Sequence, residues 1–187
     1  MRPMSDSPII EETRLWLERA VIGLNLCPFA KAAHQKTQIR WVESAACDEE
    51  ALVAELISEL ERLAEADPAL IDTTLLIHPQ VLQDFDDFND FMGVAEAVLE
   101  ELELDGEIQI ASFHPQYRFE GTAADALGNY TNRSPHPTLH LLREASIERA
   151  LDAVPEAADI YERNIATLEA LGLDGWRRVM DGAAPGN

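Results

Sequence analysis

The chain has 187 residues, 47% of them hydrophobic, and it carries a formal net charge of −21 at pH 7. A chain of this length can bury one substantial core and leaves little for a second, so we expect a single domain over residues 8–180, with flexible ends at 1–7 and 181–187. The strong acidity argues against nucleic-acid binding, which depends on Lys and Arg to neutralise phosphates.

No segment approaches the roughly 20 uninterrupted apolar residues that a membrane span needs, and residues 1–6 lack the apolar core of a signal peptide. The two cysteines, Cys27 and Cys47, are too few for a disulfide framework. These features predict a cytoplasmic protein with reduced thiols and no membrane partner. These features do not determine the oligomeric state.

Helices and strands alternate along most of the chain. Helices are predicted where apolar residues recur at steps of three and four, and strands where apolar residues form short continuous or alternating runs. In chain order, the predicted elements are a helix over 11–23, a strand over 39–43, a helix over 48–66, a strand over 72–77, a helix over 84–104, strands over 108–113 and 138–142, and helices from 146 and over 156–171. This order implies βαβ units with parallel pairing among the first three strands.

The predicted fold class is therefore α/β: a single-domain layered sandwich with a mostly parallel sheet of about four strands and flanking helices. The direction of the fourth strand is left open, and an antiparallel course is one of its two options. Open α/β sheets bind ligands beyond the carboxyl ends of their strands, so we expect a site at that edge.

The motif His-Pro-Gln occurs twice, as His78-Pro79-Gln80 and His114-Pro115-Gln116. Each copy directly follows an apolar run, so both are expected at the carboxyl ends of strands. Histidine titrates near neutral pH and binds metals, so both imidazoles are candidates for chemistry. About two dozen residues connect the second phrase to Thr138, more than the ~12 to 15 at which unstructured loops become uncommon. Aromatic residues can anchor this connection, and we expect an ordered loop that roofs a cleft.

Positive charge is concentrated in and after this loop. Residues 63–117 contain no Lys or Arg, whereas the next segment contains Arg118, Arg133 and Arg143. One interpretation is a pocket in which Arg118 and Arg133 bind the carboxylate or phosphate of a small anionic molecule. The alternative is that these are ordinary surface arginines.

Three phrases of the sequence resemble one known family. They are Ile22-Gly23-Leu24-Asn25-Leu26-Cys27-Pro28-Phe29-Ala30, Ser112-Phe113-His114-Pro115 and Gly128-Asn129-Tyr130-Thr131-Asn132-Arg133-Ser134-Pro135. The family is the bacterial domain of unknown function 1415, and the resemblance extends from about Thr13 to Trp176. It supports a single-domain boundary and implies no activity, cofactor or substrate.

A metal site is one hypothesis for the histidines. His78 and His114 would end neighbouring parallel strands, and His140 would join them if the fourth strand runs antiparallel. Three imidazoles with an open position for water are typical of a hydrolytic zinc site, and iron is the other candidate metal. The alternative is that each histidine bonds to the backbone at a strand end.

Histidine acid–base chemistry without a metal is the second hypothesis. His114 would transfer the proton and Tyr130 would assist as a donor, while Asn129, Asn132 and the two loop arginines would hold the substrate. The alternative for Tyr130 and Asn132 is that they anchor the loop.

Thiol chemistry is a third hypothesis, because Cys27-Pro28-Phe29 places a cysteine at a helix start, where the helix amino terminus can lower the thiol pKa. Ala30 stands where a Cys-x-x-Cys motif would have its second cysteine. The alternative for Cys27 is buried packing.

The sequence thus favours a small enzyme that uses histidine acid–base or metal chemistry on a small anionic substrate. A noncatalytic binding or sensor module for an anionic metabolite is the alternative from another class. A redox or transferase activity of the Cys27 thiol is the further alternative.

Overall fold

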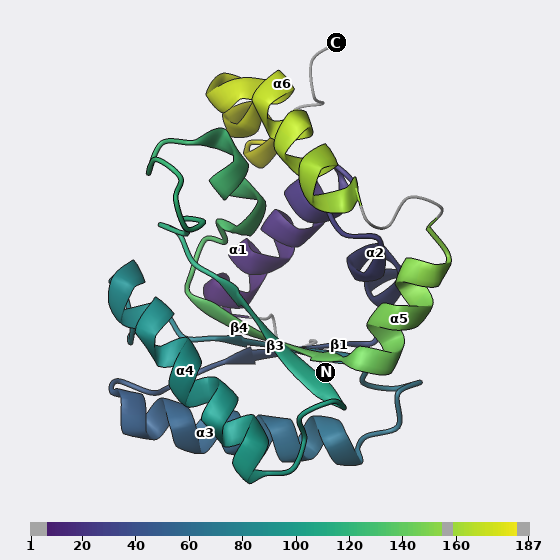
Figure 1. Ribbon diagram of the computed structural model, residues 1–187, viewed down its shortest axis with the longest axis vertical. Coiled ribbons are helices and arrows are strands. Elements are labelled where there is room, and N and C mark those ends of the chain that lie inside the picture. Colours follow the sequence, from purple (N-terminus) through teal and green to yellow (C-terminus); the bar gives the residue numbers. More distant parts are fainter. Residues whose placement is uncertain (1–6, 155–158, 183–187) are drawn as a thin grey trace, which may run out of the picture.

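The computed structural model describes residues 7–154 and 159–182. Its centre is a four-stranded sheet with the order β1-β2-β4-β3 (Figure 1). The strands are β1 (Ile39–Glu43), β2 (Thr73–Ile77), β3 (Ile108–Phe113) and β4 (Thr138–Arg143). All four lie within one residue of their predicted bounds. Most of the predicted flexible ends (1–6 of 1–7 and 183–187 of 181–187) and the start of the last predicted helix (156–158) lie outside the described residues.

The sheet has one parallel pair, β1 with β2, and β4 runs antiparallel to both of its neighbours, β2 and β3. The α/β class and the single layered domain are confirmed, and the fourth strand, whose direction the sequence leaves open, is antiparallel. The prediction of a mostly parallel sheet is wrong. Strands β2 and β3 do point the same way, but β4 lies between them, so the helical crossover between β2 and β3 skips one strand position.

One face of the sheet is covered by α3 (Glu49–Glu65) and α4 (Phe85–Glu101), which lie side by side below the sheet in Figure 1. Both helices begin at an aspartate cap: Asp48 accepts a hydrogen bond from the Ala51 amide at 2.8 Å, and Asp84 accepts from the Asp86 amide at 2.9 Å. Apolar residues at three- and four-residue steps bury their faces against the sheet. The core on this side includes Leu52, Leu56, Leu60, Leu63, Phe88, Phe91, Leu139 and Leu141.

The opposite face is covered by a second group of helices (Figure 1). In chain order they are α1 (Pro8–Trp16), which continues into the π-helix η1 (Leu17–Ile22), then α2 (Pro28–Gln35) and α5 (Glu144–Asp152). Helix α6 (Ile160–Met180) lies farther from the sheet (Figure 1) and packs mainly on η1 and on the 3₁₀-helix η2 (Leu127–Asn132). Gly172 has a φ of 68° and breaks α6 where the sequence predicts a helix end, but the chain then resumes a helix. Among the described residues, no helix is long and apolar enough to cross a membrane.

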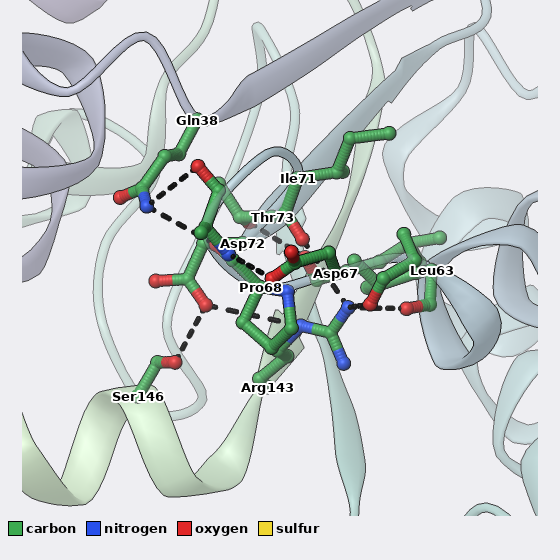
Figure 2. Close-up of polar contacts among 12 residues, drawn as sticks. Gln38, Leu63, Asp67, Pro68, Ile71, Asp72, Thr73, Arg143 and Ser146 are labelled. Carbon is green, nitrogen blue, oxygen red and sulfur yellow. Dashed lines mark hydrogen bonds and ion pairs between the residues drawn. The ribbon is translucent and has the colours of Figure 1, made fainter.

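A polar network surrounds Arg143 at the end of the sheet where strand β2 begins (Figure 2). The guanidinium donates to the carbonyl oxygens of Leu63, Ala66 and Ile71, and it lies 3.8 Å from the carboxylate of Asp72. Because β4 runs antiparallel to β2 and β3, Arg143 at its carboxyl end lies at the opposite end of the sheet from His78 and His114. Arg143 therefore lies apart from the histidines and has a structural role.

Candidate functional site

Both histidines of the repeated phrase are buried at the expected edge of the sheet, on the α4 side. His114 is 1% exposed, and both of its ring nitrogens are satisfied: Nε2 donates to the Leu82 carbonyl oxygen at 3.1 Å, and Nδ1 accepts from the Gln116 amide at 3.0 Å. His78 is fully buried, and its Nδ1 donates to the Val81 carbonyl oxygen at 2.9 Å. Both rings pack against Phe88.

Burial lowers the pKa of both imidazoles, that of His78 to about 4, because the charged form would lose its hydration. Both are therefore neutral near pH 7. They fasten the loop after β2 to the sheet, and in that loop Leu82 has a φ of 57°, which is strained for leucine. This geometry gives no support to acid–base chemistry at His114, because neither of its nitrogens is free to meet a substrate.

The structure does not bring His78, His114 and His140 together. The first two lie just beyond strand ends, whereas His140 is the third residue of β4 and faces the opposite side of the sheet from Leu139 and Leu141. In addition, β4 separates the strands that precede the first two. Nowhere in the described parts of the chain do three or more His, Cys, Asp or Glu side chains form a group that could hold a metal ion. The predicted zinc or iron triplet is thus not formed.

The long connection after β3 is ordered mainly by its own polar groups. Asn129 is fully buried, accepts from the Phe119 amide at 3.0 Å and donates to the Ala123 carbonyl oxygen at 2.9 Å. Asn132 donates to the Ser112 carbonyl oxygen at 3.3 Å. Both amides thus form hydrogen bonds that hold the loop.

The aromatic and cationic residues of the loop also anchor it. Arg133 donates to the carbonyl oxygens of Tyr117 and Ala124, and its guanidinium lies 4.5 Å from the centre of the Tyr130 ring. Tyr130 in turn packs edge-on against Trp176. The loop is ordered as expected, and the contacts of Tyr130 fit the anchoring interpretation.

A polar cavity of about 320 Å³ lies between this loop and the start of α4. Arg118 and Arg133 both line it, so the two predicted anion-binding residues do converge. Asp84 and Asp86 line it as well, and Asp86 lies 3.4 Å from Arg118. Two carboxylates therefore face two guanidiniums, and this balance reduces the attraction for an anion.

A second cavity, of about 240 Å³, lies on the other face of the sheet, where α1, η1, α2 and α5 cover it. Its walls are almost entirely apolar and include Leu75, Phe113 and Leu142 from the sheet. Few lining side chains carry a polar atom; they are Trp16, Cys27, Gln109 and His140. This apolar cavity is the candidate functional site.

His140 is one of the polar residues that line the apolar cavity from the sheet. Its Nε2 lies 2.8 Å from the hydroxyl oxygen of Thr73, and its ring packs against Phe113 with 5.6 Å between the ring centres. Burial lowers the pKa of His140 to about 3, because no charged group offsets the loss of hydration. The imidazole is therefore neutral near pH 7.

Cys27 lines the same cavity at the start of α2, as the residue before the helical Pro28. Burial raises the pKa of the thiol, and the nearby amides of Ala30 and Phe29 offset this only in part. Desolvation thus outweighs the helix amino terminus, and the thiol is protonated near pH 7. This result does not support the hypothesis of an activated thiolate.

Sequence reasoning missed the apolar cavity and the position of His140 in it. The sequence does contain a signal for this position, because successive side chains of a strand point to opposite faces of the sheet. If Leu139 and Leu141 face α3 and α4, His140 must face the helices on the other side. Small residues such as Ala30, Ala111 and Ala150 leave space there, but their sequence neighbours do not reveal which of them face each other.

Comparison with known proteins identifies one similarity. The model of a family described as "Protein of unknown function (DUF1415)" matches residues 8–178. No curated protein and no solved structure matches the chain.

Proposed function

Because the chain belongs to the DUF1415 family of proteins of unknown function, we propose its function from the site itself: it is a noncatalytic module that binds a small, mostly apolar molecule in the apolar cavity. The observation that carries this proposal is the cavity of about 240 Å³ between the sheet and helices α1, α2 and α5. Protein interiors hold few voids larger than a water molecule. Sites for small molecules are concave, mostly apolar and furnished with few polar groups, and this cavity has that composition.

The size of the cavity sets the size of the ligand. An engineered apolar cavity of roughly 150 Å³ in another protein binds benzene. The apolar cavity here is larger, so a single aromatic ring with a short substituent is a suitable first probe.

Binding is better supported than catalysis because of the basicity of His140. A general base works best when its pKa lies near the working pH, and the pKa of His140 is about 3. An imidazole that is so weakly basic accepts a hydrogen bond but is poorly suited to remove a proton. The raised pKa of Cys27 likewise gives little thiolate for nucleophilic chemistry.

The proposal is tested by adding toluene to the wild-type protein and to Ala111→Phe, which fills the cavity from β3. At ten times its Kd, toluene is expected to stabilise the wild type by about 1.4 kcal/mol and to raise Tm by about 3 to 6 °C. Ala111→Phe should lose this response. Ala97→Phe is the matched control, because Ala97 is exposed on α4, on the other side of the sheet, and its response should equal that of the wild type. Equal toluene responses of the wild type and Ala111→Phe would refute the proposal.

A small anion in the polar cavity is a second candidate function, favoured by the convergence of Arg118 and Arg133. Inorganic phosphate and acetate are the probes, and Arg118→Gln is the variant, because Arg118 is half-exposed and its side chain pairs only with Asp86 among the described contacts. Binding in the wild type that weakens in Arg118→Gln and at high ionic strength would support this candidate.

A further inference from the structure

We infer that the molecule in the apolar cavity carries a neutral hydrogen-bond donor, such as a hydroxyl group, which the Nδ1 atom of His140 accepts. This inference rests on the proposed function and specifies the chemical class of its ligand. It follows from the hydrogen bonds of two residues, Thr73 and His140.

The hydroxyl group of Thr73 fixes where the imidazole proton lies. Its oxygen is 2.6 Å from the Leu141 carbonyl oxygen, which can only accept, so the single hydroxyl proton is donated there. The same oxygen lies 2.8 Å from His140 Nε2. With its proton committed, Thr73 must accept at that contact, and Nε2 of His140 must be the donor.

Nδ1 of His140 then carries a lone pair and no proton, because a neutral imidazole holds one proton only. Among the described residues, Nδ1 makes no hydrogen bond. The side chain is half-buried and lines the apolar cavity with Leu75 and Phe113. An acceptor in apolar surroundings gains free energy when a donor reaches it, so the site favours a ligand that supplies one.

The rest of the lining determines that the donor is neutral. A carboxylate or phosphate would bring lone pairs against the lone pair of Nδ1. An ammonium group would donate, but the cavity has no carboxylate to compensate a buried cation. A hydroxyl group or an aromatic N–H meets both conditions.

Trp16 also lines the apolar cavity. Its indole Nε1 is buried and has no hydrogen-bond partner within the described chain. The Trp16 ring lies 5.1 Å from the ring of Phe113, on which His140 also packs. The indole of Trp16 and the imidazole of His140 therefore both contact Phe113, whose ring also lines the cavity.

Phenol and toluene form a pair of probes of similar size that differ in the hydroxyl group. We define the phenol advantage as Kd for toluene divided by Kd for phenol. In His140→Phe, the phenol advantage should fall by roughly tenfold, the worth of one hydrogen bond, because this ratio cancels a change of cavity shape that affects both probes alike. Thr73→Val should also reduce the phenol advantage, because Nδ1 can then carry the proton.

A measurement on the unaltered protein supports the same test if a variant fails to fold. In a ¹⁵N-labelled sample, long-range correlations of the His140 ring should show a protonated Nε2 and a bare Nδ1, and phenol should shift the Nδ1 signal more than toluene does. A protonated Nδ1, or a phenol advantage unchanged in His140→Phe, overturns the inference while toluene binding leaves the proposed function intact. If neither probe binds, the proposed function fails first.

Discussion

The Nε2 atom of His114 donates a hydrogen bond to the carbonyl oxygen of Leu82 across 3.1 Å, and Leu82 is the residue whose φ of 57° strains the loop after β2. A residue in this region costs on the order of 1 kcal/mol or more, and it persists where its surroundings hold it. The buried imidazole is part of those surroundings. His114, which the sequence analysis considers as a catalytic residue, thus stabilises a strained turn.

Replacing His114 by alanine should destabilise the protein by about 2 to 4 kcal/mol, because the change leaves the Leu82 carbonyl and the Gln116 amide unpaired and opens a void beside Phe88. Urea unfolding followed by circular dichroism measures this loss. His34→Ala is the control, since His34 is partly exposed on α2 and should change stability by less than about 1 kcal/mol. Equal losses in the two variants would contradict the role assigned to His114.

The depressed pKa of His78 makes the protein less stable in acid. From pH 6.5 to about pH 4, the unfolded chain binds a proton at His78 and the folded chain does not, so stability falls as the pH is lowered. The free energy of unfolding should fall by on the order of 3 kcal/mol over this pH range. His78→Phe lacks this titration, so the stability of the wild type relative to His78→Phe should decrease between pH 6.5 and 4. A difference that stays constant over this range would show that the pKa of His78 is ordinary.

Removing Arg143 should cost about 3 to 5 kcal/mol, because it leaves Asp72 and the carbonyl oxygens of Leu63 and Ala66 without their cation. Arg143→Leu tests this by urea unfolding. Arg177→Ala removes an exposed arginine from a surface ion pair with Asp174 and should cost less than about 1 kcal/mol. The expected ranking fails if the two variants unfold at the same urea concentration.

Alkylation should distinguish the two thiols in the folded protein. Cys47 is exposed, whereas the raised pKa and burial of Cys27 keep its thiolate population low. With iodoacetamide at pH 7.5, we expect Cys47 to react at least about tenfold faster than Cys27, as read by peptide mass spectrometry. Cys47→Ser should leave a slowly reacting protein that becomes reactive in urea. Rapid modification of Cys27 without denaturant would restore the thiol hypothesis.

Local elements were predictable from the sequence because their signals are local. The apolar runs that become β2 and β3 have the predicted bounds to within one residue. The order of strands was not predictable in this way. The expectation of adjacent parallel strands follows from short crossovers, whereas the place of β4 depends on a loop that returns the chain between β2 and β3.

Within the site, too, the features with local sequence signals were predictable, and those that depend on contacts between distant segments were not. That His78 and His114 would stand at one edge of the sheet could be read from the ends of two apolar runs. Which nitrogen of each ring bonds to which carbonyl depends on Val81 and Leu82, and their backbone geometry has no clear sequence signal. Strand alternation would have given the face on which His140 lies, although that signal was missed. Its partner Thr73 is far away in the sequence, and only the register of β2 with β4 brings the two residues together.

The place of β4 also bears on how the molecule forms. Until residues 138–143 have been synthesised, β2 and β3 have no shared partner, and each presents an unpaired backbone edge to solvent. Of the four strands that the structure describes, β4 is thus the last to be synthesised, and it is the one that joins the halves of the sheet. Such late, long-range pairing slows folding and leaves the growing chain open to association through those edges.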